Sequence, residues 1–225
     1  MNIVKKDKKS KFNRYSLGEE IFSSVSHGVG CLLSVAGLVI LVVFSALKSD
    51  AWSVVSSAIY GGSLVVLYCM STLYHAITNE KAKKFFRIMD HNTIFFLIAG
   101  TYTPITLDVL RRNDPFLGWI LFGIVWGAAI IGICLNSIDL TKYSKPSVVC
   151  YIAMGWVIIF AIKPMLSAMA PFSLWFLVLG GVFYTVGVIF YAIKKVKYFH
   201  SVWHIFTIAG SAFQYFAILY HIITR

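Results

Sequence analysis

Seven apolar runs, each about 20 residues or longer, constrain this chain more than any other feature. They cover residues 21–47, 51–77, 86–108, 116–136, 147–166, 172–193 and 200–223. A helix of about 20 residues crosses the roughly 30 Å hydrocarbon core of a bilayer, because each residue adds 1.5 Å. We therefore predict an all-α, polytopic membrane protein built as a bundle of seven transmembrane helices.

Composition agrees with this prediction and excludes a soluble globular protein. The chain is 59% apolar and 13% charged, against roughly 25% charged in an ordinary soluble domain. The segments between the apolar runs are too short for a soluble domain, and no signal peptide is expected. We predict a basic cytoplasmic segment at residues 1–20, followed by a transmembrane domain at residues 21–225.

The distribution of basic residues predicts the orientation in the membrane. Five of the 20 Lys and Arg residues fall on one side of the predicted bundle, and the other 15 fall in the N-terminal segment and the loops on its side. The five are Lys48, Arg111, Arg112, Lys163 and Arg225. Loops rich in Lys and Arg stay in the cytoplasm, so we expect a cytoplasmic N-terminus and an extracytoplasmic C-terminus in the cell membrane.

The orientation and the last span exclude two classes of seven-helix protein. A G-protein-coupled receptor has the opposite orientation, and a microbial opsin needs a lysine midway along residues 200–223, which contain none. The net charge of +11 would suggest nucleic acid in a soluble chain. Here the basic residues flank apolar runs, so we expect them to contact anionic lipids and expect no nucleic-acid partner.

Titratable residues inside spans are costly and therefore mark candidate functional sites. His75 ends the second predicted span, Asp90 begins the third, and His200 and His204 begin the seventh. With the N-terminus inside, all four lie toward the cytoplasmic ends of their helices. Residues far apart in the sequence are thus predicted to meet at one membrane depth.

The spacing of these residues favours a metal site. His200 and His204 are four residues apart, so both imidazoles lie on one face of a helix. Ser71 and His75 have the same spacing and therefore also share a helix face. Two histidines at this spacing can also be hydrogen-bonded core residues. A third histidine and a carboxylate at the same depth favour a metal, because three histidines and a water form a common catalytic zinc set.

Other polar residues in the spans suggest supporting contacts. Glu20 and His27 share one face of the first span, where a role behind the metal ligands and simple helix packing are both open. His91 follows Asp90 but points about 100° away around a helix, so we expect it to face a neighbouring helix or the headgroups. Pro104 should kink the third span.

Five motifs in order make this chain resemble the hemolysin III family, the bacterial branch of the progestin and adipoQ receptor group, which includes the adiponectin receptors. They are SHGVG at 26–30 after Glu19 and Glu20, STLYH at 71–75, MDH at 89–91, AGTYTP at 99–104 and HSVWH at 200–204. The resemblance spans residues 17–223. One departure is Ser23, where the family usually has an asparagine, which weakens any role assigned to the first helix.

The resemblance implies an intramembrane Zn²⁺ ion held by His75, His200 and His204, with a water as the fourth ligand and with Ser71 and Asp90 as the matching serine and aspartate. The first functional hypothesis is a zinc hydrolase that acts on a lipid amide or ester. In this hypothesis Asp90 takes the proton of the attacking water and Ser71 donates a hydrogen bond to the developing oxyanion or to the water. The partner would be a membrane lipid or fatty acyl chain.

Two other hypotheses remain open at this stage. The chain could be a sensor or regulator of membrane lipid composition and fluidity, in which a structural zinc ties the second, third and seventh spans together. It could also be a pore-forming hemolysin, but a pore needs a polar stripe through the whole bundle. The polar residues of this sequence gather at one end, so the pore ranks last.

Overall fold

The computed structural model describes residues 15–225, and every regular element in this part of the chain is helical. The predicted all-α fold is therefore confirmed. The elements are α1 (Leu17–Lys48), α2 (Ala51–Ala76), α3 (Glu80–Thr103), the π-helix η1 (Pro104–Leu110), α4 (Arg111–Asn113), α5 (Pro115–Trp156), the 3-10 helix η2 (Val157–Ala161), α6 (Ile162–Ala168), α7 (Pro171–Ala192) and α8 (Phe199–Thr224). Most of the predicted N-terminal basic segment lies outside the described residues.

Side-chain caps determine where the first helices begin. Ser16 and Glu19 form a capping box, in which the Ser16 hydroxyl accepts from the Glu19 N–H and the Glu19 carboxylate accepts from the Ser16 N–H. Asp50 caps α2 and Asn79 caps α3, each by accepting hydrogen bonds from two backbone N–H groups. These caps satisfy donors that the first helical turn leaves unpaired, so short local motifs set the loops between spans.

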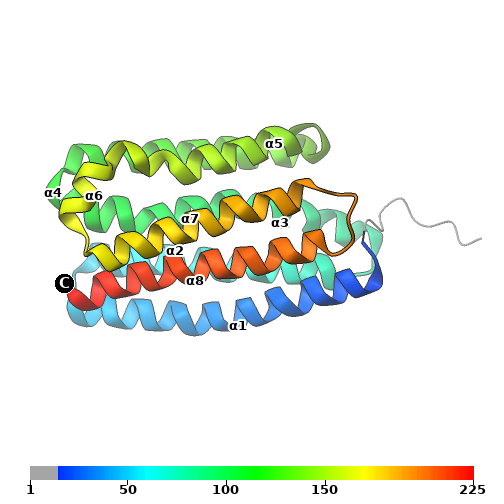
Figure 1. Cartoon of the computed structure of the whole chain (residues 1–225), viewed down its shortest axis with the longest axis horizontal. Helices are drawn as coiled ribbons and strands as arrows, with labels where there is room; N and C mark the ends of the chain where they lie inside the picture. Colours follow the sequence, from blue (N-terminus) through cyan, green and yellow to red (C-terminus); the bar gives the residue numbers. More distant parts are fainter. Residues whose placement is uncertain (1–14) are drawn as a thin grey trace, which may run out of the picture.

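Six helical segments are long and apolar enough to cross a membrane, whereas the sequence predicts seven spans. The difference arises in Pro115–Ala168, which has 54 residues and would be roughly 80 Å long as one straight helix. The backbone leaves helical geometry at Asp139 (φ −152°, ψ 90°). The Asp139 side chain accepts hydrogen bonds from the N–H groups of Thr141 and Lys142, as a new N-cap does. Figure 1 shows α5 folding back at the end of the bundle where α1 begins. The count of seven spans stays a prediction.

The long helices pack side by side in a ring. Helix α1 packs on α2, α2 on α3, α3 on α5, α8 on α1 and α7 on α8, as can be followed in Figure 1. Successive helices run in opposite directions. The starts of α1, α3 and α8 and the end of α2 therefore share one end of the bundle, which is the end that carries the predicted site residues.

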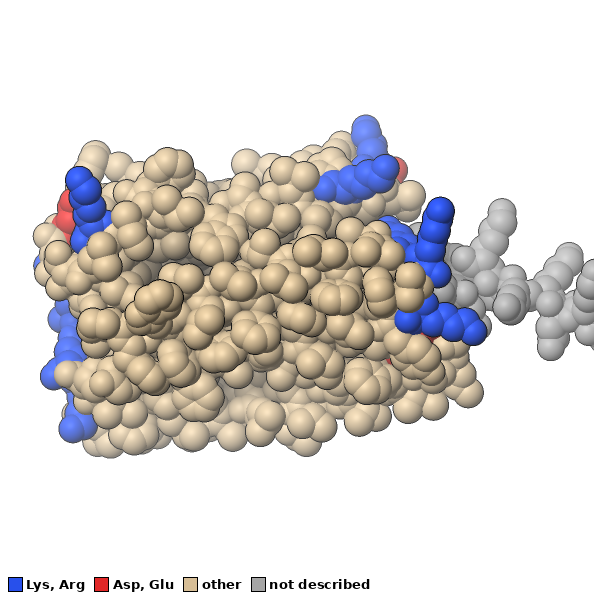
Figure 2. All heavy atoms as spheres, viewed as in Figure 1, with Lys and Arg blue, Asp and Glu red and all other residues tan. Residues whose placement is uncertain are grey.

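The bundle is apolar outside and partly polar inside, the reverse of a soluble helix bundle. Leu32 and Leu33 on α1 point outward and are 74% and 64% exposed. The buried positions of α1 hold Glu19, Ser23, His27, Gly30, Ser34, Gly37, Leu41 and Ser45. In the view of Figure 2, Lys and Arg gather at the two ends and leave a wide uncharged band between them. Small and polar residues between helices and apolar residues outside are typical of a multi-pass membrane protein.

The predicted irregularity at Pro104 takes the form of a π-helix. Proline lacks the N–H that would donate to the preceding turn, and η1 begins at this residue. The hydroxyls of Thr103 and Thr106 donate to the backbone carbonyls of Ala99 and Tyr102. All seven residues of η1 are buried, so the distorted turn lies inside the bundle.

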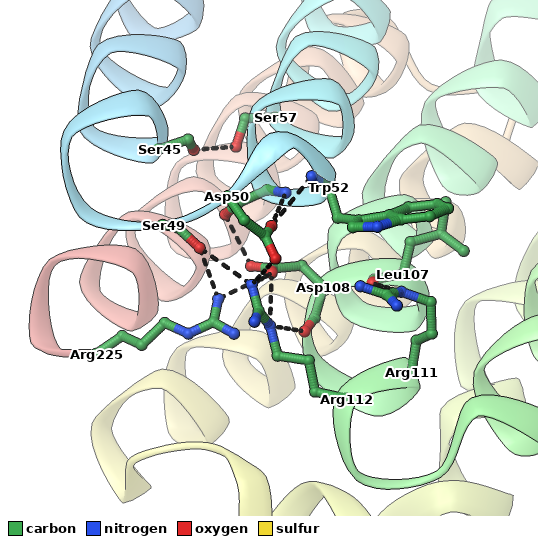
Figure 3. A network of polar contacts seen from close by, with 11 residues as sticks. Ser45, Ser49, Asp50, Trp52, Ser57, Leu107, Asp108, Arg111, Arg112 and Arg225 are labelled. Carbon is green, nitrogen blue, oxygen red and sulfur yellow. Dashed lines mark hydrogen bonds and ion pairs between the residues drawn. The ribbon is translucent and has the colours of Figure 1, made fainter.

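Asp108, in η1, is the centre of a polar network at the end of the bundle opposite the histidines (Figure 3). Its carboxylate accepts hydrogen bonds from Ser53 Oγ at 2.8 Å, from Arg112 at 2.9 Å and from Arg225 at 2.8 Å. Arg112 also pairs with Asp50 at 2.8 Å. The network therefore ties the start of α2, the end of η1 and the C-terminus of α8 together.

Candidate metal centre

Three histidine side chains meet at one end of the bundle. His75 lies in the last turn of α2, and His200 and His204 lie at the start of α8. One ring nitrogen of each lies within 4.8 Å of the others. The Nε2 atoms of His75 and His200 are 3.3 Å apart, and those of His200 and His204 are 3.2 Å apart. The structure thus brings together the three residues that the sequence singled out as metal ligands.

These distances fit the edges of a metal tetrahedron. Zinc binds imidazole nitrogen at about 2.0–2.1 Å, which separates two ligands of a tetrahedral site by roughly 3.3–3.4 Å. The two measured Nε2 separations lie within about 0.2 Å of that range. Lone pairs that converge on one point repel each other unless a cation lies between them. The donor set therefore fits a small divalent cation such as Zn²⁺.

The position of Glu20 favours the His75 tautomer that a metal ligand requires. Glu20 Oε2 is 2.6 Å from His75 Nδ1, and the second carboxylate oxygen pairs with Lys83 Nζ at 2.9 Å. A proton on Nδ1 that is donated to a carboxylate leaves the Nε2 lone pair free. Glu20 therefore lies where the sequence suggested a supporting contact. Lys83 was missed, because its charge was attributed to membrane orientation.

His27 lies against the metal-site histidines without joining them. Its ring stacks on that of His204 with centroids 3.7 Å apart, and both rings line a small cavity beside the histidines. One turn before it, Ser23 is buried and its hydroxyl lies 3.2 Å from that of Ser201, next to His200 in the chain. The departure from the family pattern at Ser23 is thus accommodated by a hydroxyl pair between α1 and α8.

Asp90 and Ser71 line a small cavity beside the histidines. The cavity has a volume of about 20 Å³ and is also lined by His200 and His204, which leaves room for about one water molecule. The Ser71 hydroxyl is buried and makes no well-aligned hydrogen bond to a described residue, although it is close enough to the Asp90 carboxylate to interact with it. A hydroxyl donor and a carboxylate acceptor therefore face a space of one water that His200 and His204 also line.

His91 and Tyr15 complete the surroundings of the site. His91 faces a neighbouring helix, as expected, because its Nε2 lies 3.3 Å from the hydroxyl of Tyr191 on α7. Its ring also lines the small cavity, with Nδ1 3.5 Å from Asp90 Oδ2, a contact that the sequence did not predict. Tyr15 stacks on His200 with centroids 4.4 Å apart and closes that side of the cluster. Tyr15 was missed because it precedes the first span, in a segment interpreted only by its charge.

An apolar cavity of about 90 Å³ adjoins the histidine site toward the middle of the bundle. Its walls come from α2, α3, α5, α7 and α8 and include Leu97, Trp156 and Tyr184. Leu67, Ile94, Tyr191, Trp203 and Thr207 line both this cavity and the small one at the metal site. The polar site therefore adjoins an apolar interior cavity.

Comparisons with known proteins agree with this arrangement. Residues 15–215 match the model of a family described as "Haemolysin-III related". The chain is 41% identical to "Hemolysin-3" of Bacillus cereus over 91% of this chain and 92% of that protein. It is also 41% identical to "Hemolysin-3 homolog" of Bacillus subtilis (strain 168), over 92% and 96%.

More distant relatives and solved structures complete the comparison. The human "Monocyte to macrophage differentiation factor" is 27% identical over 85% of this chain and 82% of that protein. No solved structure matches the chain significantly.

Proposed function

Because this chain belongs to the hemolysin III family, a group of multi-pass membrane proteins that in bacteria reside in the cell membrane, we propose that it is an intramembrane zinc hydrolase. Its substrate is an acyl lipid with an amide or ester bond. The single observation that carries the proposal is the convergence of three Nε2 atoms, 3.2 and 3.3 Å apart, beside a cavity of one water.

The histidine set has the composition of a catalytic zinc site. Structural zinc sites usually have four protein ligands, whereas catalytic sites have three and an open position. Within residues 15–225, the group that can hold an ion comprises His75, His200 and His204, and Asp90 is not part of it. This supports a hydrolase over a sensor with a purely structural zinc. In such a site zinc would polarise the lipid carbonyl and activate water.

The remaining roles fall to side chains around the cavity. Asp90 Oδ accepts the proton of the attacking water, because its carboxylate lines the cavity that has room for one water. Ser71 donates its hydroxyl proton in a hydrogen bond to the oxygen on which negative charge develops. Glu20 keeps the His75 ring oriented through the 2.6 Å contact to Nδ1.

The apolar cavity positions the substrate. Its shared walls with the metal-site cavity let an acyl chain lie among α3, α5, α7 and α8 with its carbonyl group at the histidines. Apolar walls exclude bulk water and strengthen the electrostatic interactions in the site. The same cavity would serve a lipid sensor, so the decisive observable is bond cleavage.

Mass spectrometry of lipids in reconstituted bilayers tests the proposal. Wild-type protein should release fatty acid from at least one member of a panel of ceramides and phospholipids. Asp90→Asn and zinc-stripped wild type should not, although Asp90→Asn should retain zinc. Asp114→Asn is the matched control, because Asp114 caps α5 at the other end of the bundle and Asn caps equally well. Wild-type release no greater than that of the stripped protein would refute the hydrolase and favour the sensor.

A further inference from the structure

A third cavity lies on the outer side of the histidines, and its lining is basic. It has a volume of about 690 Å³ and is lined by Arg87, Lys194, Lys195 and Lys197 with one carboxylate, that of Glu19. We call this cavity the basic mouth. The cationic side chains come from α3 and from the loop between α7 and α8, so two separate segments contribute charge of the same sign.

The carboxylate in the basic mouth is already engaged. Glu19 Oε2 accepts hydrogen bonds from the N–H and the hydroxyl of Ser16, and Oε1 accepts from the N–H of Tyr198 at 2.7 Å. These contacts anchor the α7–α8 loop to the start of α1. The half-buried Arg87 guanidinium has no ion-pair partner among residues 15–225. The basic mouth therefore retains an excess of positive charge.

The basic mouth adjoins the candidate metal site. His91, Tyr191 and His200 line both the basic mouth and the small cavity that contains Asp90. Tyr191 also lines the apolar cavity. The order along the bundle is thus an apolar cavity, three histidines and a basic mouth, which is also the order of groups in a lipid with an acyl chain, a carbonyl and an anionic headgroup.

We propose that the basic mouth binds the phosphate of an acyl lipid whose ester or amide carbonyl lies at the histidines. In a glycerophospholipid only a three-carbon glycerol unit separates the acyl ester from the phosphate, so both groups fit adjoining cavities. An uncharged headgroup, such as that of a ceramide, would leave the cations without a counter-charge. This inference deepens the proposed function, on which its assignment of a substrate class rests.

Basic loops at one membrane face attract anionic lipids in general. A matched control must therefore separate this general attraction from binding in the basic mouth. Lys142 and Lys145 lie just after the fold-back at Asp139, at the same end of the bundle as the basic mouth, and are exposed. They are not part of its lining. Replacing both lysines with Gln lowers the net charge at this end by two, as replacing two cations of the basic mouth does, but leaves the lining of the basic mouth unchanged.

Binding of two ether lipids tests the inference independently of catalysis, because an ether has no carbonyl group that an amide or ester hydrolase could attack. The probes are 1-O-hexadecyl-glycerol-3-phosphate and 1-O-hexadecylglycerol, which share the chain and differ in the phosphate. Native mass spectrometry should show at least tenfold tighter binding of the phosphate lipid. Arg87→Gln with Lys195→Gln should weaken it about 25-fold, at about fivefold per charge, and leave the uncharged lipid unaffected.

The controls separate the outcomes. The Lys142→Gln with Lys145→Gln variant should bind both lipids as wild type does, and inorganic phosphate alone should compete only at much higher concentration. Equal binding of the two lipids, equal loss in both double variants, or equally tight binding of inorganic phosphate would overturn the inference.

Hydrolysis of the matching ester lipids is measured in parallel. Preferential phosphate-lipid binding without hydrolysis would refute the proposed function alone. Hydrolysis that is indifferent to the phosphate would refute the headgroup assignment alone.

Discussion

Replacing Glu20 with Gln should weaken zinc binding without unfolding the bundle. The Glu20 carboxylate lies 2.6 Å from His75 Nδ1, and the side chains of this pair are 12% and 0% exposed, so solvent screens the contact little. Loss of such a carboxylate behind a ligand histidine costs about 10- to 100-fold in metal affinity, or roughly 1.4–2.7 kcal/mol. The lower charge also leaves the buried Lys83 cation, 2.9 Å from Glu20 Oε1, uncompensated near the metal.

A competition titration of purified protein with a zinc chelator measures the effect. Glu19→Gln is the matched control, because Glu19 is the preceding residue, contacts Ser16 and Tyr198, and Gln preserves a capping box. Its zinc affinity should equal that of wild type. Adding Lys83→Met to Glu20→Gln should restore part of the affinity by removing the unpaired cation. Equal affinities of Glu20→Gln and Glu19→Gln would refute the role of Glu20.

Three further predictions address other parts of the molecule. Ser71→Ala should lower the rate of lipid hydrolysis about 100-fold with unchanged zinc content, and a parallel loss of zinc would instead indicate a structural role. Asp108→Asn should lower the free energy of unfolding by about 3 kcal/mol. This is the low end of the range for breaking a buried ion pair, because Arg112 and Arg225 are 33% and 23% exposed. Thermal unfolding in detergent measures this loss, and an unchanged midpoint would show that the network is dispensable. Alkaline phosphatase fused after Arg225 should be active and a cytoplasmic fluorescent reporter there dark, whereas the opposite pattern would reverse the orientation.

The sequence predicts the helical class well because lipid imposes a minimum length on every apolar run. It predicts helix boundaries less well. Helix α5 includes Lys142 and Pro146, which the sequence assigns to a loop, because polar residues at a membrane edge can stay helical. The hairpin at Asp139 falls inside that predicted loop, where an N-cap side chain starts the second helix.

The positions of the site residues can be predicted from the sequence where helix geometry determines them, and less well where packing between helices determines them. His200 and His204 share a helix face by their spacing alone, and helix direction places His75 and Asp90 at the same depth. The sequence places His91 against a neighbouring helix, and Tyr191 of α7 meets its imidazole. It does not show that the same ring lines the small cavity, because a rotation of about 100° on an isolated helix leaves out the packing of the other helices.

Lys83 shows a different limit of prediction. Charge pattern alone cannot show that this lysine is buried, because burial follows from its pairing with Glu20 on another helix.

The most direct test of the central claim is the zinc content of the purified protein. Elemental analysis of wild type, extracted in detergent without added metal chelators, should give one zinc per chain. The variant with His75→Ala, His200→Ala and His204→Ala should contain less than about a tenth of that amount and melt at a lower temperature, because the ion joins α2 to α8. Stoichiometric zinc in the triple variant would contradict the assignment of the metal centre, and so would wild-type protein that binds no zinc when it is supplied.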